Sequence, residues 1–142
     1  MSKLLDMLIK HEGSEQYAYF CTSGKLTIGV GRNIDPKGGI GLSPREITYL
    51  LQNDVDRVEQ ELINSIPWVE HMEWQRMDAL VNICFNLGLP RFLKFKKALA
   101  AAEDQDWELC ADEFMDSMWA SQVGQRAVEL TTIIRTGEYE ES

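Results

Sequence analysis

The apolar positions of the first thirty residues change from a helical to an alternating period. Over residues 4–9 apolar side chains recur at helical spacing, and Gly13 is a typical residue at which a helix ends. Over residues 17–30 the chain alternates between two faces, interrupted by the turn residues Thr22-Ser23-Gly24-Lys25. The pattern predicts a short helix that ends at Glu12 and is followed directly by a β-hairpin.

The rest of the chain has the helical period almost throughout. Ser43-Pro44-Arg45-Glu46 has the residues of a capping box, and the apolar positions after it predict one helix of about twenty residues, roughly 30 Å long. A similar apolar stripe predicts a helix over 73–87, and residues 91–102, which carry a cluster of lysines, are predicted to form a further helix. The acidic residues at 103–106 are suited to begin the next helix.

Polar segments lie between and after the predicted helices. Residues 32–41 combine Asn, Pro and Gly, and they are predicted to form a loop at the edge of a small N-terminal lobe. Asp35 precedes Pro36 in this loop, and we interpret it as a turn residue. The acidic tail, 138–142, is predicted to be frayed. The chain is therefore expected to be mainly helical, with one small β element near its N-terminus.

The composition is that of a folded, acidic protein. Its 142 residues, 44% of them hydrophobic, fit one domain or two small lobes that share a helix. The formal net charge is -9, with 23 acidic and 14 basic residues, which argues against a nucleic-acid backbone or an anionic membrane as the main partner. The first ten residues carry charges and contain no apolar run of the length that a signal peptide or membrane anchor needs.

The cysteines and histidines form no disulfide or metal pattern. The chain has an odd number of cysteines, and they are widely spaced: Cys21, Cys84 and Cys110. We therefore expect all three to be free thiols, in a protein that is synthesised in a reducing cytoplasm. Cys84 lies on an apolar helical stripe and is predicted to be a core thiol. The two histidines, His11 and His71, lie far apart in the sequence, and we expect neither a metal site nor a cofactor.

The residues that carry chemistry are concentrated between Glu12 and Gly31. Eight residues separate Glu12 from Cys21, and five separate Cys21 from Thr27, which begins the run Thr-Ile-Gly-Val-Gly. A carboxyl group at the end of a helix meets the negative end of the helix dipole, which favours its protonated form and suits a general acid. Taken singly, each of the three has an ordinary structural explanation: a solvated helix end, a small buried hydrophobe and a strand residue.

Taken together, the spacing, the helix-hairpin context and the glycine pattern resemble the phage lysozymes, or endolysins, of glycoside hydrolase family 24. The resemblance extends over almost the full length and is also strong over 119–137. It implies the α+β, mainly helical lysozyme-like fold, as a single domain over 1–142. In that fold residues 12–60 form an N-terminal lobe with the hairpin and the connecting helix, and residues 1–11 and 61–142 form a helical C-terminal lobe.

The resemblance also implies an activity, the hydrolysis of the β-1,4 bond between N-acetylmuramic acid and N-acetylglucosamine in bacterial peptidoglycan, without a cofactor. Glu12 matches the acid that protonates the glycosidic oxygen, Cys21 the second catalytic position, and Thr27 the residue that holds the water. Four further residues are expected to bind the substrate: Asn33, Phe85, Asn86 and Arg126.

Three of these matches carry more specific interpretations. Asn86, close before Gly88, is explained as well by a helix C-cap as by a hydrogen bond to a sugar N-acetyl group. Phe85 is interpreted as a core residue with an edge that faces the cleft. Arg126 matches the arginine that reaches the catalytic glutamate in the family.

Many relatives carry Asp at the position of Cys21, and three roles stay open for this thiol. An ordinary thiol, with a pKa near 8.5, is only a few per cent thiolate at neutral pH. Cys21 acts as a thiolate that stabilises an oxocarbenium-like state, as a nucleophile in a retaining reaction, or as a spacer while Thr27 holds the water. Two further functions also stay open: a lytic transglycosylase, which needs one acid and no water, and a catalytically silent peptidoglycan-binding protein.

The resemblance implies where the protein acts and with which partners. An endolysin stays in the host cytoplasm until a second phage protein, a holin, opens the membrane, and then acts on the cell wall. We expect a monomer that does not bind nucleic acid and does not insert into membranes. Many family members are basic, whereas this chain has a net charge of -9. Its activity is therefore expected to tolerate moderate salt, since it gains no long-range attraction to an anionic wall.

Overall fold

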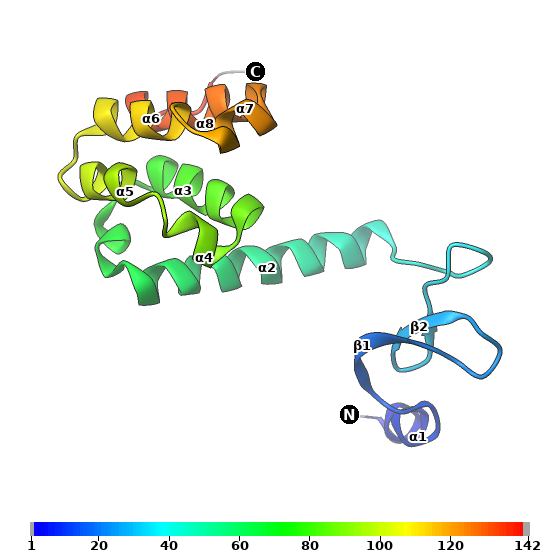
Figure 1. The fold of residues 1–142 in the computed structure, drawn as a ribbon. Coiled ribbons are helices and arrows are strands. Elements are labelled where there is room, and N and C mark those ends of the chain that lie inside the picture. Colours follow the sequence, from blue (N-terminus) through cyan, green and yellow to red (C-terminus); the bar gives the residue numbers. More distant parts are fainter. Residues whose placement is uncertain (1, 141–142) are drawn as a thin grey trace. The chain divides into compact units, whose positions relative to one another are not determined.

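The computed structural model describes residues 2–140, which form two compact units that meet between Leu51 and Gln52 along the chain. The N-terminal unit starts with helix α1, Lys3–Glu12, and continues as a three-stranded antiparallel sheet of β1, Glu15–Phe20, β2, Leu26–Gly29, and β3, Arg32–Asn33 (Figure 1). The mainly helical α+β fold class is thus confirmed. The assignment of residues 1–11 to the C-terminal lobe stays a prediction.

Helix α1 ends where the sequence predicted, and its start is capped by a residue that the sequence analysis did not single out. The Ser2 hydroxyl accepts a hydrogen bond from the Leu5 N–H at 3.1 Å, so that one free donor of the first turn is satisfied. Gly13 has a φ of 80° and donates its N–H to the Ile9 carbonyl, which ends the helix directly after Glu12.

The sheet is larger than the predicted hairpin. Gly29, the last residue of β2, and Gly31, in the tight turn after it, both have positive φ, and the chain returns along β2 so that Asn33 pairs with Thr27. The expectation of a loop from residue 32 onward is therefore wrong for its first two residues. Further along, the Asp35 carboxylate accepts hydrogen bonds from the N–H groups of Leu26 and Lys37, which hold its pKa below the ordinary value. Asp35 is the turn residue that the sequence indicated.

Helix α2, Pro44–Ser65, begins in the N-terminal unit and ends in the C-terminal unit, with the length that the sequence predicted. Its capping box is formed: the Glu46 N–H donates to the Ser43 hydroxyl at 3.2 Å, and the Ser43 N–H donates to the Glu46 carboxylate at 2.9 Å. The same carboxylate pairs with Arg32 at 2.5 Å, so that β3 is tied to the first turn of the helix.

The C-terminal unit is a bundle of short helices that shares its core with the second half of α2. After the 3₁₀ helix η1, Pro67–His71, and α3, Trp74–Leu87, come α4, Leu89–Phe92, α5, Lys96–Glu103, α6, Trp107–Met115, α7, Met118–Val123, and α8, Gln125–Thr136. Helix α6 packs on α5 and on α8, and α8 also packs on α3. No helix within residues 2–140 is both long and apolar enough to cross a membrane.

One helix prediction in this unit is wrong. The segment 91–102 contains the end of α4 and most of α5 rather than one helix, because the chain breaks at residues 93–95. The break lets both Phe92 and Phe95 pack on the Phe114 ring, with centroid distances of 6.3 Å and 5.0 Å.

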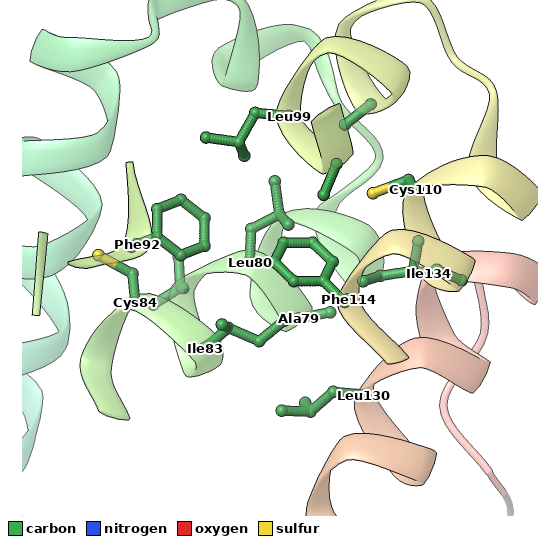
Figure 2. Close-up of a cluster of buried hydrophobic side chains, with 14 of the residues drawn as sticks. Ala79, Leu80, Ile83, Cys84, Phe92, Leu99, Cys110, Phe114, Leu130 and Ile134 are labelled. Atoms are coloured by element: carbon green, nitrogen blue, oxygen red, sulfur yellow. The ribbon is translucent and has the colours of Figure 1, made fainter. Parts of the chain in front are cut away.

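Figure 2 shows the core of this unit, where side chains from α3, α4, α5, α6 and α8 converge around Leu80 and Phe114. Cys84 and Cys110 are buried there as free thiols, and burial raises their pKa to about 11 and about 12. Cys84 is therefore the core thiol that was predicted.

The end of the chain is better ordered than expected. The Tyr139 hydroxyl donates to the Asp78 carboxylate at 2.7 Å, and its ring stacks on Trp74 with centroids 5.8 Å apart. Burial and this hydrogen bond raise the pKa of Tyr139 to about 12. The prediction of a frayed tail is therefore wrong for the contacts of Tyr139, whereas residues 141–142 lie outside the described part of the chain.

Candidate active site

The carboxylate of Glu12 lies against the backbone of Gly31, the last glycine of the Thr-Ile-Gly-Val-Gly run. A methyl group added to Gly31 would come within 2.7 Å of Glu12 Oε2 and 3.1 Å of its Cδ, so a larger residue there would displace the Glu12 carboxylate from this position. Glu12 is otherwise exposed in the N-terminal unit, as a residue that receives a substrate must be. The end of α1 and the β2–β3 turn thus position the predicted acid.

Cys21 lies in the turn between β1 and β2, among groups that stabilise a thiolate. Its Sγ lies 3.1 Å from the Ser23 hydroxyl, and its N–H donates to the Lys25 carbonyl at 2.9 Å. Hydrogen bonds from the Ser23 side chain, then from the N–H groups of Lys25 and Ser23, lower the pKa of Cys21 to about 7. A larger share of this thiol is therefore ionised at neutral pH than of an ordinary thiol.

Thr27 is the buried member of the predicted set, with 4% of its surface exposed. Its hydroxyl donates to the Lys25 carbonyl at 2.8 Å and also faces Cys21, so it keeps lone pairs that can accept from a water molecule. The structure thus brings Cys21 and Thr27 together. Within residues 2–140, no hydrogen bond joins either of them to Glu12, although all three belong to the same unit.

Asn33, predicted to bind the substrate, has a structural task in the loop after β3. Its side-chain oxygen accepts from the Asp35 N–H at 2.9 Å, and its carbonyl accepts from the N–H groups of Ile40 and Gly41. Its amide NH₂ remains available to donate. The substrate contact stays a prediction.

The remaining predicted residues lie in the C-terminal unit. The Asn86 side-chain oxygen accepts from the Trp119 indole N–H at 2.8 Å, and because an indole can only donate, the Asn86 NH₂ group must point away from it as a free donor. Helix α3 is capped by Gly88 instead, so the alternative of Asn86 as C-cap is wrong. Phe85 is 42% exposed, which places it on the surface and not in the core.

Arg126 is held by a residue that the sequence did not single out. Its Nε and Nη2 donate to the Asn82 side-chain oxygen at 3.1 Å and 2.6 Å, which fixes the guanidinium on α3. The predicted contact of Arg126 with Glu12 stays a prediction, as do the substrate-binding roles of Phe85, Asn86 and Arg126.

Residues 9–135 match the family model described as Phage lysozyme. The chain belongs to the phage lysozyme family. Membership in this family makes it a lysozyme, a hydrolase of peptidoglycan, which removes the catalytically silent alternative.

The relatives in this lysozyme family come from different settings. The chain is 28% identical to a protein named probable T4-type lysozyme 2 of Dictyostelium discoideum, over 99% of this chain and 98% of that one. It is 26% identical to probable T4-type lysozyme 1 of the same organism, over 96% of both chains. It is also 28% identical to the pre-baseplate central spike protein Gp5 of Enterobacteria phage T4, over 96% of this chain but 28% of that protein. The family alone therefore leaves the biological setting of this lysozyme open.

Gly31 gives a test of how the acid is positioned. Gly31→Ala should lower kcat about 10- to 100-fold, because the added methyl group would push the Glu12 carboxylate away from its position. Gly29→Ala is the matched control, since Gly29 has nearly the same φ, 67° against 66°, but nothing within 4 Å of the added methyl group. Both variants should lose about 1–2 kcal/mol of stability from left-handed backbone strain. Equal rates of peptidoglycan hydrolysis in the two variants would contradict the positioning role.

The ionisation of Cys21 gives a second test. Its rate of alkylation by iodoacetamide should rise with pH through a midpoint of about 7, because the thiolate is the reactive form. Ser23→Ala removes the hydroxyl that lowers the pKa most and should move this midpoint upward. Mass spectrometry of the native protein should find one label per chain, since Cys84 and Cys110 are buried thiols with raised pKa. A midpoint above 8.5, the ordinary value, would contradict the assignment.

Proposed function

We propose that this lysozyme cleaves the β-1,4 bond between N-acetylmuramic acid and N-acetylglucosamine, with Glu12 as the general acid. The observation that carries the proposal is the position of the Glu12 carboxylate at the exposed end of α1, where Gly31 leaves room for it. An exposed carboxyl group at a helix end can approach a glycosidic oxygen and protonate it as the bond breaks.

The second part of the proposal concerns Cys21 and Thr27. A thiol with a pKa of about 7 carries negative charge at neutral pH, which supports its role as the anion that stabilises the oxocarbenium-like state. Thr27, beside it, would orient the attacking water through its free lone pairs. The alternative roles for Cys21, nucleophile and spacer, predict different effects of substituting this residue.

The variants of Cys21 separate these roles by their pH profiles. If the thiolate is the active form, wild-type kcat falls as the pH drops through about 7, because the thiol becomes protonated. Cys21→Asp should keep activity, and the fall in kcat should move to lower pH, since an ordinary aspartate titrates near 3.9. Cys21→Ser should lose most activity. Full activity of Cys21→Ser would support the spacer role instead, and a covalent glycosyl adduct on Cys21 the nucleophile role.

We further propose that the protein is an endolysin that releases phage from the host. It would act as a monomer, remain in the host cytoplasm after synthesis and reach the wall through a holin lesion. Its three free cysteines suit synthesis in a reducing compartment. Expression inside a bacterial host should cause lysis only when a pore-forming protein is expressed with it. Lysis by the chain alone would contradict the dependence on a holin.

The experiment that tests the reaction is mass spectrometry of fragments released from purified peptidoglycan. Hydrated fragments with N-acetylmuramic acid at the reducing end would support the proposed bond. Fragments with N-acetylglucosamine at the reducing end would show that the other glycosidic bond is cleaved. Products that end in 1,6-anhydromuramic acid would show that the protein is a lytic transglycosylase.

A further inference from the structure

A pocket lies in the C-terminal unit, lined by residues of η1, of the start of α3 and of the turn between α5 and α6. Its volume is about 250 Å³, and its walls include two partly exposed indole rings, those of Trp68 and Trp107. None of the predicted catalytic or substrate-binding residues lines it. Asn86 lies twelve residues beyond Trp74 on α3, about 18 Å along the helix axis, so the pocket is separate from that end of α3.

One residue of the wall is held in a strained backbone conformation. Gln105 has a φ of 60°, and within residues 2–140 it is the one non-glycine residue with positive φ. Its N–H donates to Ala102 and the next N–H, of Asp106, donates to Ala101, which together form the hydrogen bonds of a Schellman motif at the end of α5. Glycine is the usual residue at this position. The chain instead carries Gln there, and its side chain lines the pocket.

The charges in the pocket decide what kind of ligand fits. The Glu73 carboxylate already pairs with Arg76 at 2.5 Å, and the Arg76 guanidinium lies 4.5 Å from the centre of the Trp107 ring. Arg76 therefore already occupies the Glu73 carboxylate and a face of the Trp107 ring, so neither is left for a cationic ligand. The remaining groups are the Trp68 ring, the Glu103 carboxylate, the Gln105 amide and the His71 imidazole.

We propose that this pocket binds one pyranose ring of an N-acetylhexosamine glycan, at a site distinct from the predicted catalytic residues. The C–H groups of a pyranose carry partial positive charge and pack on the electron-rich face of an indole. Sugar hydroxyls donate to the Glu103 carboxylate and exchange hydrogen bonds with the Gln105 amide. At about 250 Å³ the cavity is smaller than pockets for drug-sized ligands, about 300–1,000 Å³, and takes one ring rather than an oligosaccharide.

The identity of the sugar rests on the proposed function, because peptidoglycan is a polymer of N-acetylhexosamines. Such a site would hold a glycan strand while the catalytic residues act on another part of it. It would also give an acidic protein a short-range contact with the wall that does not depend on charge attraction.

The test is a titration with tri-N-acetylglucosamine, followed by NMR of the indole N–H signals. The full chain carries Glu12→Gln so that cleavage cannot interfere. We expect the Trp68 and Trp107 signals to shift, with a dissociation constant in the millimolar range that is normal for one sugar ring. Trp119, whose N–H is bonded to Asn86, reports on the other end of α3 and should not follow the same titration curve.

Two substitutions in this background make the test specific. Gln105→Gly should weaken binding about fivefold or more while the melting temperature stays equal or rises, because glycine relieves the strain at this φ. Glu103→Gln should also weaken binding, whereas Glu129→Gln, at an exposed position on α8, should not.

The site is overturned if neither Trp68 nor Trp107 shifts at ~10 mM sugar, the range in which a single ring should bind. It is equally overturned if only Trp119 responds, or if Gln105→Gly binds as tightly as the parent. Failure of the proposed function looks different. In that case wild type releases no fragments from peptidoglycan, but the Trp68 and Trp107 signals still shift.

Discussion

Glu12→Gln should reduce the rate of peptidoglycan hydrolysis by about 10³-fold while the protein stays folded. Glutamine keeps the shape of the side chain beside Gly31 but cannot donate a proton to the leaving oxygen, and general acid catalysis contributes about 10²–10⁴-fold. Glu12 is exposed in its unit, so its replacement should leave the melting temperature nearly unchanged. The measurement is the rate of release of soluble fragments from purified peptidoglycan.

The control for this variant is Glu15→Gln, which removes an exposed carboxylate three residues away, in β1. It should retain nearly full activity, because Glu15 lies outside the contact with Gly31. General acid catalysis contributes at least about 10²-fold to the rate. If Glu12→Gln keeps more than a tenth of the wild-type rate, the loss is too small for this role, and another residue must be the acid.

The substitutions at Glu12 and Gly31 test two different requirements of the acid, its proton and its position. Glu12→Gln removes the proton and leaves the position, whereas Gly31→Ala leaves the proton and moves the position. If both lower kcat and Gly29→Ala does not, the β2–β3 turn is part of the catalytic apparatus and not only a strand connection. The last glycine of the run Thr-Ile-Gly-Val-Gly would then be needed to leave space for the Glu12 carboxylate.

The features predicted correctly from the sequence are those encoded by residues close together in the chain. Gly13 ends α1 because glycine reaches a positive φ, and Ser43 and Glu46 cap α2 because their side chains reach each other's N–H groups. The hairpin follows from alternation and turn residues. In each case the physical cause lies within a few residues of its effect.

The predictions that failed depend on partners that are distant in sequence. The chain breaks at residues 93–95, and Phe95 packs on Phe114, nineteen positions later by residue number. Tyr139 is ordered by Asp78 and Trp74. Helical periodicity carries no information about such contacts.

The candidate site divides in the same way. The spacing of Glu12, Cys21 and Thr27 could be read directly, and the structure brings the last two together. The low pKa of Cys21 was missed because it needs the folded turn that carries Ser23, although a Ser two residues after a Cys in a turn is a usable signal. The roles of Asn82 and Trp119 in fixing Arg126 and Asn86 had no local signal at all.

Arg76→Ala should destabilise the C-terminal unit by about 3 kcal/mol, the largest stability effect that we expect from a single polar residue. Arg76 lies on α3 and is 8% exposed, and its Nε and Nη2 donate to the carbonyls of Ile134 and Arg135 at 2.7 Å and 3.0 Å. These carbonyls belong to the last turn of α8, where a helix has no further N–H groups to satisfy them. Each acceptor left without a partner costs about 1–3 kcal/mol, and the contact with Trp107 is lost as well.

Tryptophan fluorescence during urea unfolding measures this effect on the correct unit, because all four tryptophans, at positions 68, 74, 107 and 119, lie within 52–142. Arg76→Lys should lose about half as much stability, since an ammonium group reaches fewer of the acceptors than the guanidinium fork does. Arg57→Ala is the control: its ion pairs with Asp54 and Glu61 are formed by a side chain 61% exposed, and exposed pairs contribute at most about 1 kcal/mol. If Arg76→Ala unfolds at the same urea concentration as Arg57→Ala, the end of α8 does not depend on Arg76, and the link between α3 and α8 must rest on apolar packing alone.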